Sequence, residues 1–151
     1  MQARRMKLRP YKPSDDAELA DVWFESWRST GLTLPVVTRA DLRARVPMEL
    51  ATRWAVTVAE EDDRITGFLA LARRERRIDQ LFVRPGDQGS GTGTALFDAA
   101  RAQLPEGFWL ATQPGNARAR AFYERRGMRL DRIEDHNGVD RVIYVLDPPT
   151  D

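Results

Sequence analysis

Residues 78–94 read IDQLFVRPGDQGSGTGT and contain the pattern that decides the fold. The apolar run 78–83 predicts a strand, and Arg84-Pro85-Gly86 predicts that this strand stops. From Thr92 onward, apolar residues recur at helical spacing until a proline and a glycine end the pattern. A glycine-rich turn therefore connects a strand directly to an amphipathic helix.

The turn from Gln88 to Gly93 has the chemistry of a phosphate-binding loop. Because glycine has no Cβ, the backbone can curl tightly and direct several N–H groups at one point. The helix that follows adds unpaired amides and the positive end of its dipole, which favour pyrophosphate. The segment has no lysine for a Walker loop, and Thr94 and Leu96 stand where a GxGxxG fingerprint needs glycine. A flexible glycine-serine connection is the alternative, but such linkers do not usually join a strand to an amphipathic helix.

The composition limits the class of protein. The chain has 151 residues, of which 42% are hydrophobic and 31% charged, as in a folded domain, and we expect one domain over residues 1–151. A net charge of +1 provides no global positive field, so we expect no nucleic-acid partner. Cysteine is absent and His136 is the only histidine, which excludes thiolate chemistry and argues against a metal site.

Hydropathy gives an expectation about location. No apolar run approaches the roughly 20 residues that span a bilayer, and the N-terminal MQARR leads into no apolar signal core. We therefore expect a cytoplasmic protein without a membrane partner.

The other patterns predict an α/β fold, an α+β mixed sheet with helices packed on it. Asn137-Gly138 is typical of a hairpin turn, and Gly127 is suited to end a helix. Strands are expected at 7–10, 54–59, 65–71, 78–83, 108–112, 129–136 and 141–146, and helices at 15–27, 38–46, 92–104 and 117–126.

Two segments resemble the GCN5-related N-acetyltransferase (GNAT) superfamily. Its signature after the fourth strand is Gln/Arg-x-x-Gly-x-Gly/Ala, which Gln88, Gly91 and Gly93 match. Residues 116–128, NARARAFYERRGM, resemble the family's Asn-x-x-Ala-x-x-x-Tyr-Glu-x-x-Gly-Phe helix, with Met128 in place of the usual aromatic residue. The two motifs agree in order and separation, and the resemblance covers residues 54–146 well.

The resemblance implies the GNAT fold, with a central sheet splayed between strands 78–83 and 108–112 and acetyl-CoA as the acetyl donor. The pantetheine arm would lie in the gap and pair with the backbone of Leu81, Phe82 and Val83 as an added strand would. Asn116 would contact the donor from the second motif. The loop that would hold the pyrophosphate consists of Gln88, Gly89, Ser90, Gly91, Thr92, Gly93 and Thr94.

The resemblance also implies direct attack of a primary amine of a small molecule or peptide on the thioester. Tyr123 occupies the family's tyrosine position, and a phenol with a pKa near 10 can serve as general acid; packing as a helix-face hydrophobe is its alternative. Asp79 is the candidate base, although alternation does not determine which face it shares with the substrate, and a surface aspartate is its alternative. Some relatives instead carry a glutamate five positions before the helix asparagine, where this chain has Ala111.

Acceptor residues are expected at the end of the first helix. Trp27 and Arg28 precede the loop that covers the acceptor site in relatives. Core packing is the alternative for Trp27. Arg28 is suited to bind a carboxylate of the acceptor. The sequence thus predicts an acetyl-CoA-dependent N-acetyltransferase. A catalytically silent acyl-CoA-binding module or sensor is the alternative function, and a homodimer stays open.

Overall fold

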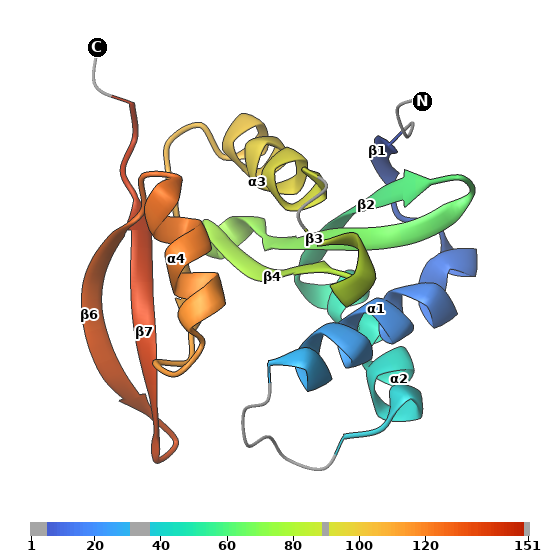
Figure 1. Ribbon diagram of the computed structural model, residues 1–151, viewed down its shortest axis with the longest axis horizontal. Coiled ribbons are helices and arrows are strands. Elements are labelled where there is room, and N and C mark those ends of the chain that lie inside the picture. The colour runs from blue at the N-terminus through green and yellow to red at the C-terminus, as the bar shows by residue number, and fades with distance from the viewer. Residues whose placement is uncertain (1–5, 31–36, 89–90, 150–151) are drawn as a thin grey trace.

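The structure is a computed structural model and describes residues 6–30, 37–88 and 91–149. Within these ranges the chain forms a seven-stranded mixed sheet in the order β1-β2-β3-β4-β5-β7-β6, with helices against both faces (Figure 1). The strands are β1 (Met6–Pro10), β2 (Trp54–Glu61), β3 (Arg64–Ala72), β4 (Arg77–Val83), β5 (Phe108–Thr112), β6 (Arg129–His136) and β7 (Val139–Leu146). The α-helices are α1 (Asp16–Ser29), α2 (Arg39–Thr52), α3 (Thr92–Gln103) and α4 (Ala117–Arg125).

The sheet consists of two antiparallel halves joined at one point. Strands β1 to β4 form one half, and β5, β7 and β6 form the other. Between the halves, β4 and β5 run parallel with a single paired position, Arg77 with Trp109. The Trp109 amide donates to the Arg76 carbonyl at 3.0 Å and its indole Nε1 donates to the Glu75 carbonyl at 3.0 Å, which fixes the closed end of the gap. The predicted mixed sheet, splayed between β4 and β5, is confirmed.

Each face of the sheet has its own apolar core. On one face α1 and α2 pack on β2 and β3, and the aromatic centre of this core is Trp23, Trp54 and Phe68. On the other face α3 and α4 pack on both halves, around Phe97 and Tyr144. Because α3 and α4 contribute to one core with β4, β5 and β7, this second core spans the splay.

The second helix is longer than the sequence predicts. Thr38 caps α2 as expected: the Asp41 amide donates to its hydroxyl at 3.1 Å, and its own amide donates to the Asp41 carboxylate at 2.9 Å. The helix was expected to end at Val46, but it continues through Pro47 to Thr52. A proline inside a helix removes one backbone hydrogen bond, to the residue four positions earlier. Here both Pro47 and that residue, Arg43, are exposed, so water can solvate the freed carbonyl.

Two turns confirm the sequence patterns that predicted them. Asn137 and Gly138 have φ angles of 54° and 82°, as a tight hairpin turn requires, and Gly127 ends α4 with φ of 90°. None of the helices in the described ranges is long and apolar enough to cross a membrane.

Candidate active site

The open edge of β4 presents the backbone groups that an added strand would need. The Arg84 amide donates to the Thr66 carbonyl at 2.7 Å, so Arg84, and by strand alternation Phe82, direct their backbone groups toward β3. Leu81 and Val83 therefore direct theirs toward β5, which has parted from β4 at this level. Of the three predicted pantetheine partners, two lie with their backbone at the open edge, whereas Phe82 belongs to the β3–β4 ladder.

The carbonyl of Val83 already has two donors. The Ser26 hydroxyl donates to it at 3.0 Å, and the side-chain amide of Gln88 donates to it at 3.2 Å. Ser26 comes from α1, 57 residues earlier in the chain, and the sequence interpretation missed it because nothing local relates the two positions. These bonds hold the last turn of α1 and the start of the glycine loop against the end of β4.

The N-terminus of α3 follows directly on this edge. Gly91 is its N-cap in the left-handed conformation, with φ of 91°, and no side chain of the described ranges caps the helix. The start of a helix presents backbone N–H groups and the positive end of the helix dipole, which suits an anion. Gly89 and Ser90 lie outside the described residues. The predicted loop positions that the structure does describe here are Gln88, Gly91, Thr92, Gly93 and Thr94.

The first turn of α3 packs tightly on α4. A Cβ added at Gly93 would lie 3.1 Å from Cε2 of Phe122, closer than ordinary contact. Glycine at this position therefore lets the two helices approach. This contact brings the two motifs of the sequence, one in the loop and one in α4, to adjacent positions in space.

Tyr123 is buried one residue further along α4. Its side chain is 8% exposed, and its ring lies 6.4 Å from the rings of Phe97 on α3 and Tyr144 on β7. Among the described residues no group hydrogen-bonds its hydroxyl. Burial raises the pKa of the Tyr123 phenol to about 12, against a smaller lowering by the charge of Arg126. The phenol is therefore protonated at neutral pH, as a proton donor must be.

Asp79 occupies an irregular position in β4. Ala70 pairs with Gln80 and Leu71 pairs with Ile78, so Asp79 is an extra residue that bulges out of the ladder. Its side chain is only 7% exposed, which excludes the surface aspartate considered as its alternative.

The carboxylate of Asp79 is held by donors from β2 and the end of α2. The Arg53 guanidinium and the Trp54 indole each donate to its Oδ2 at 2.7 Å. The Nε of Arg77 lies 3.4 Å from its Oδ1. Because Trp54 belongs to the core beneath α1 and α2, Asp79 lies on that face of the sheet, opposite the face that carries Tyr123.

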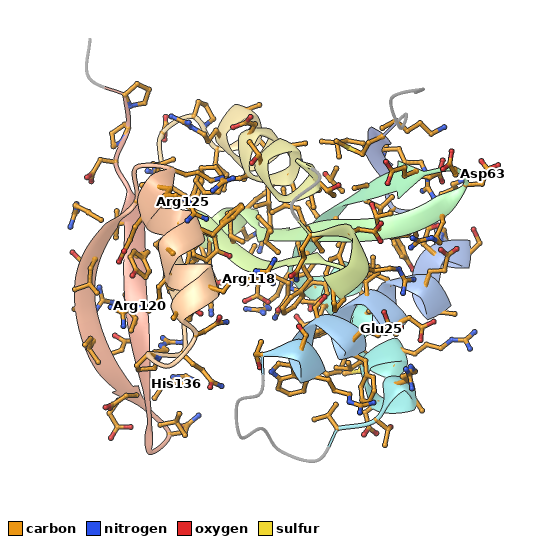
Figure 2. The ribbon with its side chains drawn as sticks, in the orientation of Figure 1. Glu25, Asp63, Arg118, Arg120, Arg125 and His136 are labelled. Atoms are coloured by element: carbon orange, nitrogen blue, oxygen red, sulfur yellow. The ribbon has the colours of Figure 1, made fainter. Side chains whose placement is uncertain are left out.

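The remaining predicted residues lie at the ends of helices. Asn116 caps α4, with its Oδ1 accepting from the Ala119 amide at 3.2 Å. Trp27 is half-buried and Arg28 exposed in the last turn of α1, which Ser26 ties to the end of β4. His136 lies at the end of β6, in the exposed β6–β7 hairpin (Figure 2).

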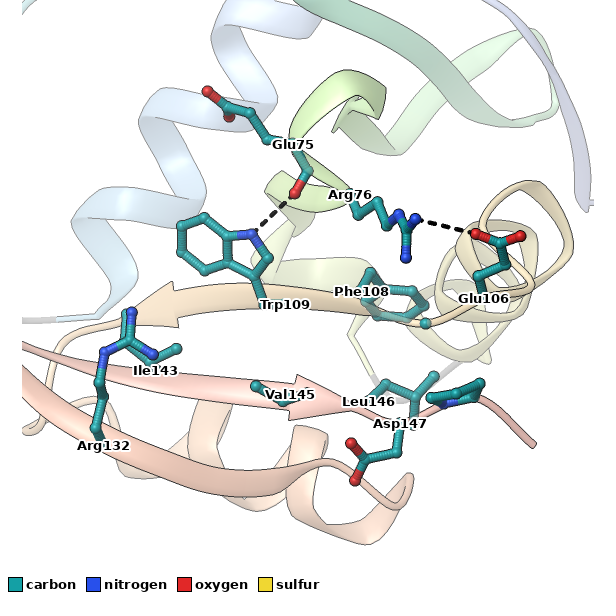
Figure 3. Close-up of a pocket in the computed structure, with 12 residues that line it drawn as sticks. Glu75, Arg76, Glu106, Phe108, Trp109, Arg132, Ile143, Val145, Leu146 and Asp147 are labelled. Atoms are coloured by element: carbon teal, nitrogen blue, oxygen red, sulfur yellow. Dashed lines mark hydrogen bonds and ion pairs between the residues drawn. The ribbon is translucent and has the colours of Figure 1, made fainter. Parts of the chain in front are cut away.

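A shallow cavity of about 370 Å³ lies at the closed end of the sheet, where Figure 3 shows Trp109, Ile143 and Val145 along its floor. Its rim includes an ion pair of 3.1 Å between Arg76 and Glu106. None of the predicted site residues lines it.

The chain thus combines a sheet that splays between β4 and β5, a helix that opens at Gly91 beside the splay, and a buried tyrosine on the next helix. The model of the Acetyltransferase (GNAT) family matches residues 16–128, and the chain belongs to this family.

Relatives of known sequence agree with this assignment. An uncharacterized N-acetyltransferase of Mycobacterium bovis is 30% identical over 103 residues, which cover 60% of this chain and 66% of that protein. The chain thus spans just under two thirds of that relative's length. A protein of Mycobacterium tuberculosis, named as a probable N-acetyltransferase, is 27% identical over 150 residues, which cover 87% of this chain and 84% of the relative.

Solved structures share the fold. The apo form of YjaB from Escherichia coli superposes with a TM-score of 0.77 at 24% identity, covering 96% of this chain and 99% of that one. The PaiA N-acetyltransferase of Thermoplasma acidophilum, solved in complex with coenzyme A, gives a TM-score of 0.73 at 18% identity, covering 93% and 98%.

Proposed function

We propose that this protein is an N-acetyltransferase that transfers an acetyl group from acetyl-CoA to a primary amine of a small molecule or peptide. The observation that carries the proposal is Tyr123, whose buried, protonated hydroxyl has no partner among the described residues and which shares one core with the open edge of β4. Membership of the GNAT family supports the reaction class.

The described residues fit the donor. Leu81 directs its backbone N–H and carbonyl into the splay, and Val83 directs its N–H there while its carbonyl is engaged by Ser26 and Gln88. The amides of a pantetheine arm would pair with these groups as a strand does. The N-terminus of α3, which no described side chain caps, suits the pyrophosphate, and the side-chain amide of Asn116 is suited to a polar group of the arm. Acetyl-CoA supplies the thioester whose carbonyl carbon is the electrophile.

The reaction needs a base for the attacking amine and an acid for the departing sulfur. We assign Asp79 Oδ1 to take the proton of the amine, directly or through water, because Oδ2 is engaged by Arg53 and Trp54. The amine nitrogen then bonds to the carbonyl carbon and the C–S bond breaks. We assign the Tyr123 hydroxyl to donate to the departing sulfur. The base lies on the α1–α2 face and the acid on the α3–α4 face, so the reacting carbon would lie between them in the splay.

The acceptor would enter from the α1–α2 side. Trp27 and Arg28 end α1 next to the open end of β4, and we assign them to the acceptor. Arg28 is exposed and its guanidinium carbon lies 5.6 Å from the centre of the Phe24 ring, so it is free to pair with a carboxylate on the acceptor.

The acid role is tested by Tyr123→Phe, which removes the hydroxyl and keeps the ring. We expect kcat to fall about 100-fold, the scale of general acid catalysis, while the Kd for CoA stays unchanged. Release of free CoA thiol with a panel of amines measures kcat, and calorimetry measures Kd. Tyr11→Phe is the matched control, because Tyr11 contacts Asp16 at the start of α1 and should leave kcat intact.

Two outcomes would contradict the proposal in different ways. Unchanged kcat in Tyr123→Phe would remove the hydroxyl from the chemistry. Binding of CoA by the natural chain without turnover on any amine would favour the catalytically silent acyl-CoA-binding module instead.

A further inference from the structure

Arg126 connects the two motifs of the candidate site. It follows the last residue of α4, and its guanidinium carbon stacks 3.5 Å from the centre of the Phe122 ring. One terminal nitrogen donates to the Phe122 carbonyl at 2.9 Å, and the other donates to the Thr94 hydroxyl in the first turn of α3. The side chain of Arg126 therefore reaches from α4 to the helix end that suits the donor's phosphates.

The positive charge of Arg126 has no ion-pair partner within the described ranges. Its Nε is buried without a hydrogen-bond partner, and Asp98 acts on it only through its charge, not through an ion pair. Burial, with the charge of Arg125, lowers the pKa of Arg126 although the charge of Asp98 raises it, so the surroundings disfavour the cation. Other arginines of this chain differ: Arg84 pairs with Glu25 at 3.1 Å, and Arg129 with Asp147 at 2.7 Å.

A half-buried cation without a carboxylate is costly, and a bound anion offsets that cost. Thr94 adds to the suitability of this place for an anion. When its hydroxyl oxygen accepts from Arg126, its own proton remains free to be donated. The amides at the start of α3 lie in the same turn, so a guanidinium, a hydroxyl and backbone N–H groups are gathered there.

We propose that Arg126, together with the Thr94 hydroxyl, binds a phosphate of the donor's nucleotide. This inference rests on the proposed function and deepens it. With this contact, the donor site would select a thioester that carries a nucleotide through the charge of Arg126 as well as through backbone amides. The planar guanidinium, held flat on Phe122, is oriented before the phosphate arrives, which reduces the entropy lost on binding. The phosphate is either the pyrophosphate or the 3′-phosphate of CoA.

The test compares Arg126→Met with Arg125→Met by calorimetric titration with CoA. Methionine keeps an apolar stem over Phe122 and removes the charge. Arg125 is exposed at the same end of α4 (Figure 2), so its variant removes an equal charge from nearly the same place. We expect Arg126→Met to weaken CoA binding 10-fold or more, the scale of a hydrogen bond to a charged group, and Arg125→Met to change it less than about 3-fold.

Titration with 3′-dephospho-CoA separates the two phosphates. If Arg126 reads the 3′-phosphate, natural chain and Arg126→Met bind dephospho-CoA equally. If it reads the pyrophosphate, the loss on substitution persists with dephospho-CoA. Either result supports the inference, and Arg126→Lys, which keeps the charge without the planar fork, should recover part of the affinity for CoA.

The melting temperature without CoA distinguishes a role of Arg126 in binding an anion from a purely structural role as a link between α3 and α4. We expect Arg126→Met to change it little, because the loss of the hydrogen bonds to Phe122 and Thr94 is offset by the removal of a half-buried cation that has no ion-pair partner in the described ranges. Equal CoA affinities for the natural chain and both variants would overturn the inference, as would equal losses in Arg125→Met and Arg126→Met. Failure of the natural chain to bind CoA would overturn the proposed donor and this inference together, so the two failures are distinguishable.

Discussion

At the residue scale, the two predicted catalytic groups have opposite surroundings. Tyr123 is buried among rings with its hydroxyl unpaired among the described residues, a condition that favours a retained proton. Asp79 is buried among donors, with Arg53 and Trp54 on one oxygen. These donors orient the carboxylate and leave Oδ1 with the longer contact to Arg77. This geometry is compatible with two roles for Asp79. A general base needs an oriented carboxylate, and a structural residue needs a cluster of ion pairs such as this one.

Asp79→Asn tests which role is dominant. Asparagine can still accept from Trp54 but cannot take a proton, so we expect kcat to fall about 100-fold with unchanged Kd for CoA. Steady-state kinetics and calorimetry measure the two quantities. Asp131→Asn is the matched control, because it makes the same change in β6, where Asp131 pairs with Arg129 and Arg132, and kcat should remain unchanged. A lower melting temperature with intact kcat in Asp79→Asn would show that Asp79 only holds the strand bulge in place.

At the scale of elements, the site depends on how closely α3 approaches α4. Gly93 allows this approach, with Phe122 directly against the place where a Cβ would be. Arg126 lies over the face of the same ring. The start of α3 and the guanidinium thus both contact the Phe122 ring, and a change in the spacing of the two helices would move all three.

Gly93→Ala should disturb the contacts that α3 and Arg126 make with the Phe122 ring. The added methyl group would meet Phe122 at 3.1 Å, so the ring or the helix must shift, and we expect CoA binding to weaken several-fold. Gly86→Ala is a matched control in the turn before the loop, because its Cβ would meet nothing within 4 Å. Calorimetric titration of both variants with CoA measures the effect. Equal affinities in the two would mean that the approach of α3 to α4 does not control the donor site.

At the scale of the whole molecule, ion pairs hold the chain together away from the site. Arg9 of β1 donates to both oxygens of Asp15, at 3.0 and 2.9 Å, and to Glu60 of β2 at 2.9 Å. These bonds to Arg9 lower the pKa of the Asp15 and Glu60 carboxyls below their ordinary values. The first strand and the start of α1 are therefore tied to the meander by charge.

This arrangement predicts acid sensitivity. A carboxyl whose pKa is lower in the folded state stabilises the fold above its unfolded pKa of about 4, and the contribution is lost as the pH falls through the folded value. We expect the free energy of unfolding, measured with urea, to fall below about pH 4. Arg9→Gln should cost roughly 1.5–3 kcal/mol at pH 7 through the Asp15 pair and should flatten this acid decline.

Arg39→Gln is the control for Arg9→Gln. Arg39 and Asp21 form an ion pair of 3.0 Å with both side chains largely exposed, so its loss should change stability by less than about 1 kcal/mol. The same acid decline in Arg9→Gln as in the natural chain would contradict the assignment to Arg9.

The sequence by itself determined the fold class and the order of the elements. Local patterns carry this information: the strand at 78–83, the glycine loop, the helix that follows, and the turn at Asn137-Gly138 all depend on residues within a few positions of one another. The separation of β4 and β5 was predicted from the resemblance to the GNAT superfamily, which also rests on two short local motifs. The local rule that proline ends a helix failed at Pro47. There α2 continues because Pro47 and Arg43 are exposed to solvent, and solvent exposure depends on the tertiary structure.

Only the tertiary structure decided how the site residues are connected. Ser26 reaches the Val83 carbonyl across 57 residues, Arg53 reaches Asp79 across 26, and Arg126 reaches Thr94 across 32. Each contact joins different elements, whose relative positions depend on how the two cores pack against the sheet. A side chain's partners are fixed by this packing and not by its neighbours along the chain. The sequence could therefore name Asp79 and Tyr123 as candidates, but their surroundings, and the lack of an ion-pair partner for Arg126 among the described residues, follow only from the folded molecule.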